Sequence, residues 1–195
     1  MPKNRLEAFA DGIFAIAATL LILNLAVTAG KPLGGELLGI WPSYVAYVIS
    51  FVTIGIMWVN HHTVMHQIAH VDRTFLMLTV LFLMLVAFVP FPTRLLALYI
   101  RTDGALAAAL AYGITLILTS VMYNALWWYA AVGRRLLRHD ADPALVRGIG
   151  RSFTVGPAIY LGATLVAFIS PLASAGLYLV IALFYVVESS IFGRR

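Results

Sequence analysis

The chain has 195 residues, of which 62% are hydrophobic and 11% charged, and its mean hydropathy is +0.95. A soluble domain of this size does not carry so much apolar surface, so we predict a polytopic, all-α membrane protein with a single domain over residues 1–195. The chain lacks cysteine, which excludes disulfides and thiolate chemistry. The first apolar run is too long for a cleavable signal peptide, so we expect it to remain in the mature protein.

Six apolar stretches are candidates to cross a bilayer, since about 20 helical residues at 1.5 Å each span its hydrocarbon core. Their approximate limits are residues 8–28, 40–65, 74–98, 105–132, 152–169 and 173–192. Pro90 and Pro92 lie near the far end of the third stretch, where we expect the helix to kink or unwind. A basic loop over residues 133–151 separates the fourth and fifth stretches.

The distribution of basic residues predicts the orientation. Three of the 13 Lys and Arg residues fall on one side of the six predicted spans, namely Lys31, Arg94 and Arg101. The other ten fall on the opposite side, namely Lys3, Arg5, Arg73, Arg134, Arg135, Arg138, Arg147, Arg151, Arg194 and Arg195. By the positive-inside rule the second side is cytoplasmic and holds both termini, which agrees with an even number of spans. The net charge of +5 therefore reflects topology, and no nucleic-acid partner is expected.

The first stretch begins with charged residues, and Asp11 lies about one turn before its fully apolar part. An ionised carboxylate is costly there unless it is paired or hydrated. In a helix, one face would carry a branched aliphatic stripe of Ile16, Leu20, Leu23 and Val27. The stripe could face lipid or a neighbouring helix, as is ordinary in membrane proteins. It could also line a central pathway whose cytoplasmic mouth is marked by Asp11, and periodicity does not choose between these interpretations.

Four of the five histidines lie between Trp58 and Arg73. His62, His66 and His70 recur every four residues, a spacing that would suit a metal, or haem with a histidine from a second helix. Three histidines on one helix rarely close a site, so we expect no metal or cofactor and predict hydrogen bonds to neighbours such as Asp11 or to water. No phosphate loop, GxSxG motif or catalytic carboxylate pair is present, so we do not expect an enzyme. A TVGYG-type carbonyl filter is also missing.

Three motifs carry a resemblance to a known family: RxxxFxDGxFAIAxTLLxL from Arg5 to Leu23, WxNHH from Trp58 to His62, and FxPFPT from Phe88 to Thr93. Together they resemble the prokaryotic members of the transmembrane protein 175 family, which are potassium-permeable cation channels. The resemblance is strong over the first half of the chain and rests on span count alone over the second half. It departs from the family at Ala10, where a serine is usual before the aspartate. The missing hydroxyl puts the local hydrogen bonding in question.

The resemblance implies a homotetramer of six-span subunits in the plasma membrane of a prokaryote, around one potassium-conducting pore that the first span lines. Ile16 would form the narrowest ring, with Leu20 and Leu23 above it, and Thr19 would assist selectivity. A polar network would lie beneath this constriction, at the cytoplasmic mouth. Its members would be Arg5, Phe9, Asp11, Trp58, Asn60, His61 and His62.

The expected function is a potassium-selective, though only weakly selective, leak-type channel with a hydrophobic constriction that closes by dewetting. Three alternatives remain open. A secondary transporter is one, although the chain shows no inverted repeat or matching pair of broken helices. A proton-permeable channel is the second, and a histidine-dependent metal or haem membrane protein is the third.

Overall fold

The computed structural model describes residues 2–27, 30 and 32–192, and side chains up to residue 186. The predicted end of the first span at residue 28, together with Lys31, Arg194 and Arg195, lies outside the described residues. The described part is helical, apart from connecting segments and an isolated bridge between Ile68 and Leu137. The helices are α1 (Lys3–Leu20), η1 (Leu21–Asn24), α2 (Leu33–Gly39), α3 (Trp41–Gln67), α4 (Arg73–Phe88), α5 (Pro90–Tyr99), α6 (Ala105–Ala131), η2 (Val132–Arg134), α7 (Pro143–Leu165), η3 (Val166–Phe168) and α8 (Pro171–Phe192).

Within the described residues, four helical stretches are long and apolar enough to cross a membrane: Lys3–Asn24, Trp41–Gln67, Arg73–Tyr99 and Ala105–Arg134. They correspond to the first four predicted spans. The stretch Pro171–Val186 is apolar but shorter. An all-α membrane fold is therefore confirmed, whereas six spans remain a prediction.

The helix α7 begins at Pro143, nine residues before the predicted fifth span, so the basic segment after α6 is helical over its second half. Asp142 caps this helix, because its carboxylate accepts a hydrogen bond from the Ala144 amide at 2.8 Å. Pro143 at the first helical position has a backbone angle suited to a helix start and lacks an amide that would be unpaired there. The prediction of a loop over residues 133–151 was therefore wrong for its second half. The prediction considered the charges of this segment and not the Asp142–Pro143 pair, which is a helix-start signal.

The two prolines of the third span act as predicted. The helix α4 ends at Phe88 and α5 begins at Pro90, with only Val89 between them. Val89 itself keeps helical angles, and its carbonyl accepts a hydrogen bond from the Thr93 amide at 3.2 Å. The prolines thus interrupt the hydrogen-bond ladder without reversing the chain.

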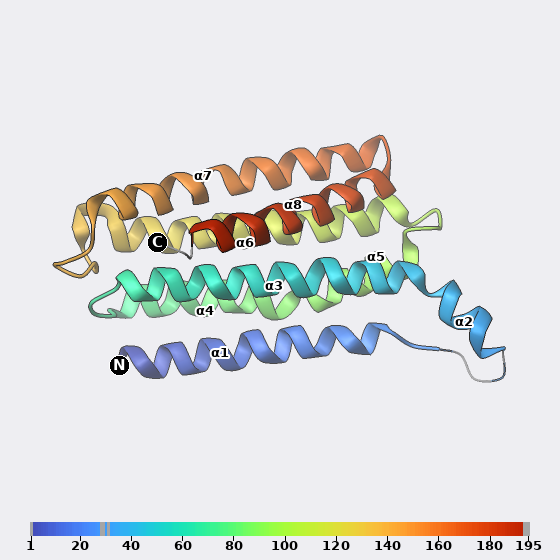
Figure 1. Cartoon of the computed structure of the whole chain (residues 1–195), viewed down its shortest axis with the longest axis horizontal. Helices are drawn as coiled ribbons and strands as arrows, with labels where there is room; N and C mark the ends of the chain where they lie inside the picture. Colours follow the sequence, from blue (N-terminus) through green and yellow to red (C-terminus); the bar gives the residue numbers. More distant parts are fainter. Residues whose placement is uncertain (1, 28–29, 31, 193–195) are drawn as a thin grey trace.

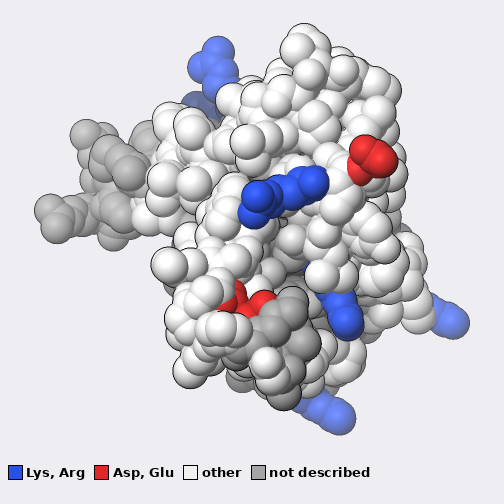
Figure 2. Space-filling view, turned by 90° about the vertical axis from the view of Figure 1, so that its right-hand side faces the viewer, with Lys and Arg blue, Asp and Glu red and all other residues white. Residues whose placement is uncertain are grey.

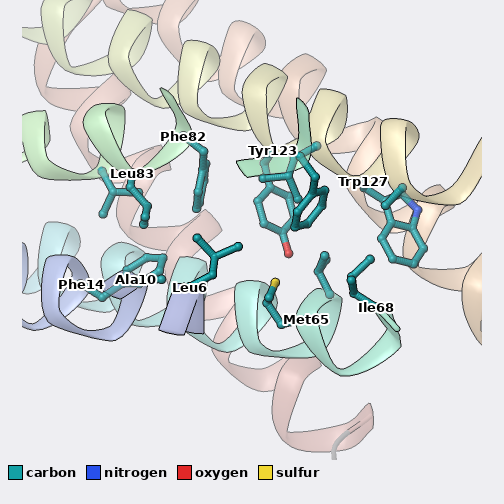
Figure 3. Packing of buried hydrophobic residues seen from close by; sticks show 14 of the residues in the cluster. Leu6, Ala10, Phe14, Met65, Ile68, Phe82, Leu83, Tyr123 and Trp127 are labelled. Atoms are coloured by element: carbon teal, nitrogen blue, oxygen red, sulfur yellow. The ribbon is translucent and has the colours of Figure 1, made fainter. Parts of the chain in front are cut away.

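The helix α1 lies along one edge of the bundle, beside α3 and α4, with α7 on the opposite edge (Figure 1). Only one face of α1 is buried in the subunit, by Leu6, Ala10, Phe14, Ala17 and Leu21. This face packs into a core cluster with α3, α4 and α6, in which Phe82, Leu83, Tyr123 and Trp127 are prominent (Figure 3). The opposite face of α1 has no cover within the subunit.

The two ends of the bundle differ in charge. The N-terminus, the α3–α4 turn and the segment between α6 and α7 lie at the same end, towards which α8 also runs (Figure 1). Eight of the basic residues assigned to the cytoplasmic side have described positions in these segments or in the adjoining turns of the helices, Arg147 and Arg151 being in α7. Figure 2 looks onto the other end, where most of the visible surface is neither basic nor acidic. The asymmetry predicted from the sequence is therefore present in three dimensions.

Candidate functional site: the exposed face of α1

The aliphatic stripe predicted on the first span lies on the uncovered face of α1 and its continuation. The exposed fractions are 57% for Ile16, 43% for Leu20, 69% for Leu23 and 49% for Val27. Residues on the opposite face of α1, such as Phe14, are at most 3% exposed. The subunit's own core therefore does not use the stripe, which must meet lipid, a second subunit or a pore.

Thr19 is exposed on this face between Ile16 and Leu20. Its hydroxyl donates back to the helix, with carbonyl oxygens of Ala15 at 2.9 Å and Ile16 at 3.0 Å as acceptors. The proton is thus engaged within the helix, and the remaining lone pair of Oγ1 is directed away from that bond. A hydroxyl held in this way presents an oxygen acceptor that can ligate a cation.

Asp11 is held by α3 and not by its own helix. The indole Nε1 of Trp58 donates to Oδ1 of Asp11 at 2.9 Å, and both residues are exposed. No ion pair joins Arg5 to Asp11 within the described part of the chain. The carboxylate therefore has a neutral hydrogen-bond partner on α3.

The two histidines of the WxNHH motif have different surroundings. His62 is exposed, with its ring 6.5 Å from the Trp58 ring, so it lies next to the Asp11–Trp58 pair. His61 is 2% exposed, and its ring lies 5.7 Å from Phe14 and is stacked on Phe82 at 6.0 Å. Its Nε2 atom is buried with no hydrogen-bond partner among the described residues. His61 is thus a packing residue behind the polar pair.

The remaining predicted members of the network do not converge on one point. Phe9 and Arg5 are exposed on α1. Asn60 is two residues from Trp58, about 200° around the helix, and lines a cavity between α3, α6 and α7. The structure therefore brings together Asp11, Trp58 and His62, and it does not bring Asn60 to them. The described residues also contain no group of three or more His, Asp or Glu side chains placed to hold a metal ion.

Replacing Trp58 with phenylalanine should weaken the attachment of α1 to α3. A hydrogen bond to a charged group contributes about 1.5–3 kcal/mol, and solvent exposure brings the expected loss closer to about 1 kcal/mol. The thermal unfolding midpoint of the purified protein measures this loss. Trp128→Phe is the matched control, since Trp128 is 54% exposed and its indole makes no hydrogen bond within the described residues. Equal midpoints for the two variants would contradict a role for the Asp11–Trp58 bond.

A set of contacts that sequence reasoning missed joins three segments at the basic end. We call it the basal clasp: Lys3, residues 67–72, Tyr129 and residues 135–138. The Lys3 ammonium donates to the Ile68 carbonyl at 3.2 Å. Backbone bonds join Ala69 to Leu136 at 2.8 Å and Arg138 to Gln67 at 2.9 Å. The start of α1 is therefore tied to the segment after α6 through the α3–α4 turn.

Asp72 is the centre of the basal clasp. Its Oδ1 accepts from the Phe75 amide at 2.8 Å, which caps α4, and its Oδ2 accepts from the Tyr129 hydroxyl at 2.6 Å. The Arg135 guanidinium lies over the Tyr129 ring at 4.8 Å. The hydrogen bond from Phe75, then that from Tyr129, lowers the pKa of Asp72 below its ordinary value of 3.8. The charged form is therefore the one that the fold stabilises.

The lowered pKa of Asp72 predicts acid sensitivity of the clasp. A carboxyl whose pKa is lower in the folded state contributes stability above its unfolded pKa of 3.8, and this is lost as pH falls through the folded value. Asn is an equally good cap, so Asp72→Asn should keep the bond from the Phe75 amide and lose the charge and its bond from the Tyr129 hydroxyl, about 1 kcal/mol or less for a solvated group. Unfolding midpoints between about pH 3 and 7 should converge for the two proteins at the acid end. A difference between the two unfolding midpoints that stays constant across that pH range would show that ionisation of Asp72 does not cause the acid sensitivity of the clasp.

Comparison with known proteins adds to this geometry. The family model of the endosomal/lysosomal potassium channel TMEM175 matches residues 5–90. A potassium channel of Chamaesiphon minutus is 42% identical over 192 residues, covering 96% of this chain and 95% of that protein. The crystal structure of a lysosomal potassium-selective channel TMEM175 homolog from Chamaesiphon minutus matches with a TM-score of 0.88 at 40% identity, covering 96% of this chain and 97% of that one. The endosomal/lysosomal proton channel TMEM175 of Gallus gallus is 30% identical over 151 residues, which are 71% of this chain and 30% of that protein.

Proposed function

This chain belongs to the TMEM175 family of potassium channels, and from that premise we propose that it conducts potassium through a leak-type pore lined by α1. It is an ion channel and not an enzyme. The observation that carries the proposed pore is the uncovered aliphatic stripe of Ile16, Leu20 and Leu23, on a helix whose other face is fully buried. A membrane helix facing only lipid has no need of polar groups, yet Thr19 is exposed next to the stripe and Asp11 is exposed five residues before Ile16.

A subunit with α1 on its edge cannot enclose a pore, so we propose that four copies place their α1 helices around a common axis. Each subunit would contribute six spans, with α7 and α8 as the fifth and sixth. The basic end would face the cytoplasm of a prokaryotic cell, with both termini on that side. Identical stripes would then meet as stacked collars of Ile16, Leu20 and Leu23.

Ion passage follows from the physical chemistry of such collars. A narrow apolar neck loses its water and closes, whereas a wider neck passes ions that give up hydration at the lowest cost. Potassium holds its water less tightly than sodium, so weak selectivity does not require a carbonyl cage. The Thr19 oxygens would replace part of the lost water. The Asp11 carboxylates, not neutralised by Arg5, would raise the local cation concentration at the mouth.

Recordings from the purified channel in planar bilayers under opposed potassium and sodium gradients test the proposal. We expect ohmic currents whose reversal potential is displaced from zero towards the potassium equilibrium potential. Saturable, coupled flux without single-channel steps would identify a transporter instead.

Proton permeation is a second candidate, favoured by the proton-channel relative from Gallus gallus. Reversal potentials under a pH gradient with symmetric potassium distinguish the two. A shift that follows the proton gradient would establish a proton component, and an unchanged potential would exclude it.

A further inference from the structure

A cavity of about 610 Å³ lies between α3, α6 and α7, away from the α1 stripe, and Tyr185 of α8 is among its lining residues. This volume is within the range of about 300–1,000 Å³ that small-molecule sites occupy. Three aromatic rings form the wall that the cavity shares with the core cluster. The centroid of the Tyr123 ring lies 5.2 Å from that of Phe82 and 4.6 Å from that of Phe153.

The cavity is elongated along the helices. Its lining on α7 extends from Ala144 to Tyr160, which corresponds to about 24 Å of helix. On α3 it extends from Thr53 to Thr63, or about 15 Å. Half of a bilayer's hydrocarbon core is also about 15 Å. The cavity therefore begins near the basic end of the bundle and extends at least the depth of one leaflet, which suits an extended chain better than a compact ligand.

The lining changes in chemistry along this length. Apolar and aromatic side chains such as Ile56, Phe82 and Phe153 form much of the wall. The lining on α7 also includes Arg151, which lies about 10 Å of helix from Ala144, is exposed and has no carboxylate partner within the described residues. No aspartate or glutamate is among the lining residues. An apolar slot with an unpaired guanidinium in its lining complements an amphiphile with an anionic head.

We propose that each subunit binds one anionic phospholipid here, with an acyl chain between α3, α6 and α7 and its phosphate on Arg151. Asn60 and Ser152 also line the slot and supply polar groups for the glycerol and headgroup region. Asn124 ties α7 to α6 beside the slot, because its Nδ2 donates both to the Ser120 carbonyl of α6 at 2.9 Å and to the Phe153 carbonyl of α7 at 2.8 Å. The lipid site goes beyond the proposed pore and does not depend on it.

Gly148 provides a direct test, since it lines the cavity and a Cβ built there meets nothing within 4 Å. Gly148→Leu should fill the slot without collision. Gly162→Leu is the matched control, because Gly162 lies on the same helix outside the cavity and also has open space at Cβ. The full-length protein would be reconstituted in vesicles of phosphatidylglycerol and phosphatidylcholine in equal parts, then extracted, and its retained lipids counted by native mass spectrometry.

We expect about one phosphatidylglycerol per subunit in the unmodified protein and in Gly162→Leu, and at least a fivefold lower occupancy in Gly148→Leu. Arg151→Gln should lower retention about tenfold, as expected for a lost charge-assisted hydrogen bond, and should remove the preference over phosphatidylcholine. Arg151 is exposed, so this second variant tests the site even if Gly148→Leu does not fold. Retention unchanged in both variants, equal retention of the two lipids, or exclusive capture of added oleate would overturn the proposal.

Discussion

Replacing Ile16 with asparagine is expected to raise the single-channel conductance and to erode the preference for potassium over sodium. Ile16 is 57% exposed on a face that the subunit core leaves uncovered, and in the proposed tetramer it forms the narrowest collar. An amide ring holds water where the isoleucine ring excludes it, which lowers the dewetting barrier. A barrier lower by about 1.4 kcal/mol corresponds to a conductance about tenfold higher.

Ile22→Asn is the matched control for this experiment. Ile22 is 50% exposed and belongs to the same helical segment, but it lies outside the stripe of Ile16, Leu20 and Leu23. The same polar substitution should leave conductance and reversal potential unchanged there. Currents and selectivity unaffected by Ile16→Asn, or altered equally by both substitutions, would remove Ile16 from the conduction path.

The reach of sequence reasoning is clearest on α1. The spacing of Ile16, Leu20 and Leu23 correctly identified one face, because a helix has a fixed period, whereas Val27 lies beyond the helix, which ends at Asn24. Burial then showed what periodicity left open within the subunit: this face is free and the face of Leu6, Ala10 and Phe14 is packed. Whether the stripe meets identical stripes depends on contacts between subunits, about which spacing within a single chain carries no information.

The polar network was harder to predict for a geometric reason. Trp58, Asn60 and His61 are close in sequence but point in different directions, since each helical residue rotates the side chain by about 100°. Only Trp58 reaches Asp11, whereas His61 enters the aromatic core and Asn60 faces the cavity. A motif written as consecutive letters therefore combined residues with three different environments. The pairing of Asp72 with Tyr129 joins residues 57 positions apart, and no local pattern signals such a contact.

Replacing Gly113 with alanine is expected to destabilise the packing of α7 and α8 on α6. A Cβ at Gly113 would collide with the Thr164 hydroxyl and with the Tyr178 hydroxyl. Those two groups are hydrogen-bonded to each other at 2.9 Å, and the Tyr178 ring packs against Tyr112 at 5.2 Å. Overpacking costs about 1–3 kcal/mol, and separating two buried hydroxyls adds about 1 kcal/mol.

The collision at Gly113 matters because it lies where α6, α7 and α8 meet. Thr164 also donates to the Tyr160 carbonyl at 2.6 Å, so the hydroxyl cannot retreat without giving up a second bond. Gly162→Ala is the control, since a Cβ there has open space and the higher helix propensity of alanine should stabilise by up to about 1 kcal/mol. Thermal unfolding in one detergent should therefore move in opposite directions for the two variants. A midpoint for Gly113→Ala at or above that of the unmodified protein would show that α7 and α8 do not pack on α6 through this contact.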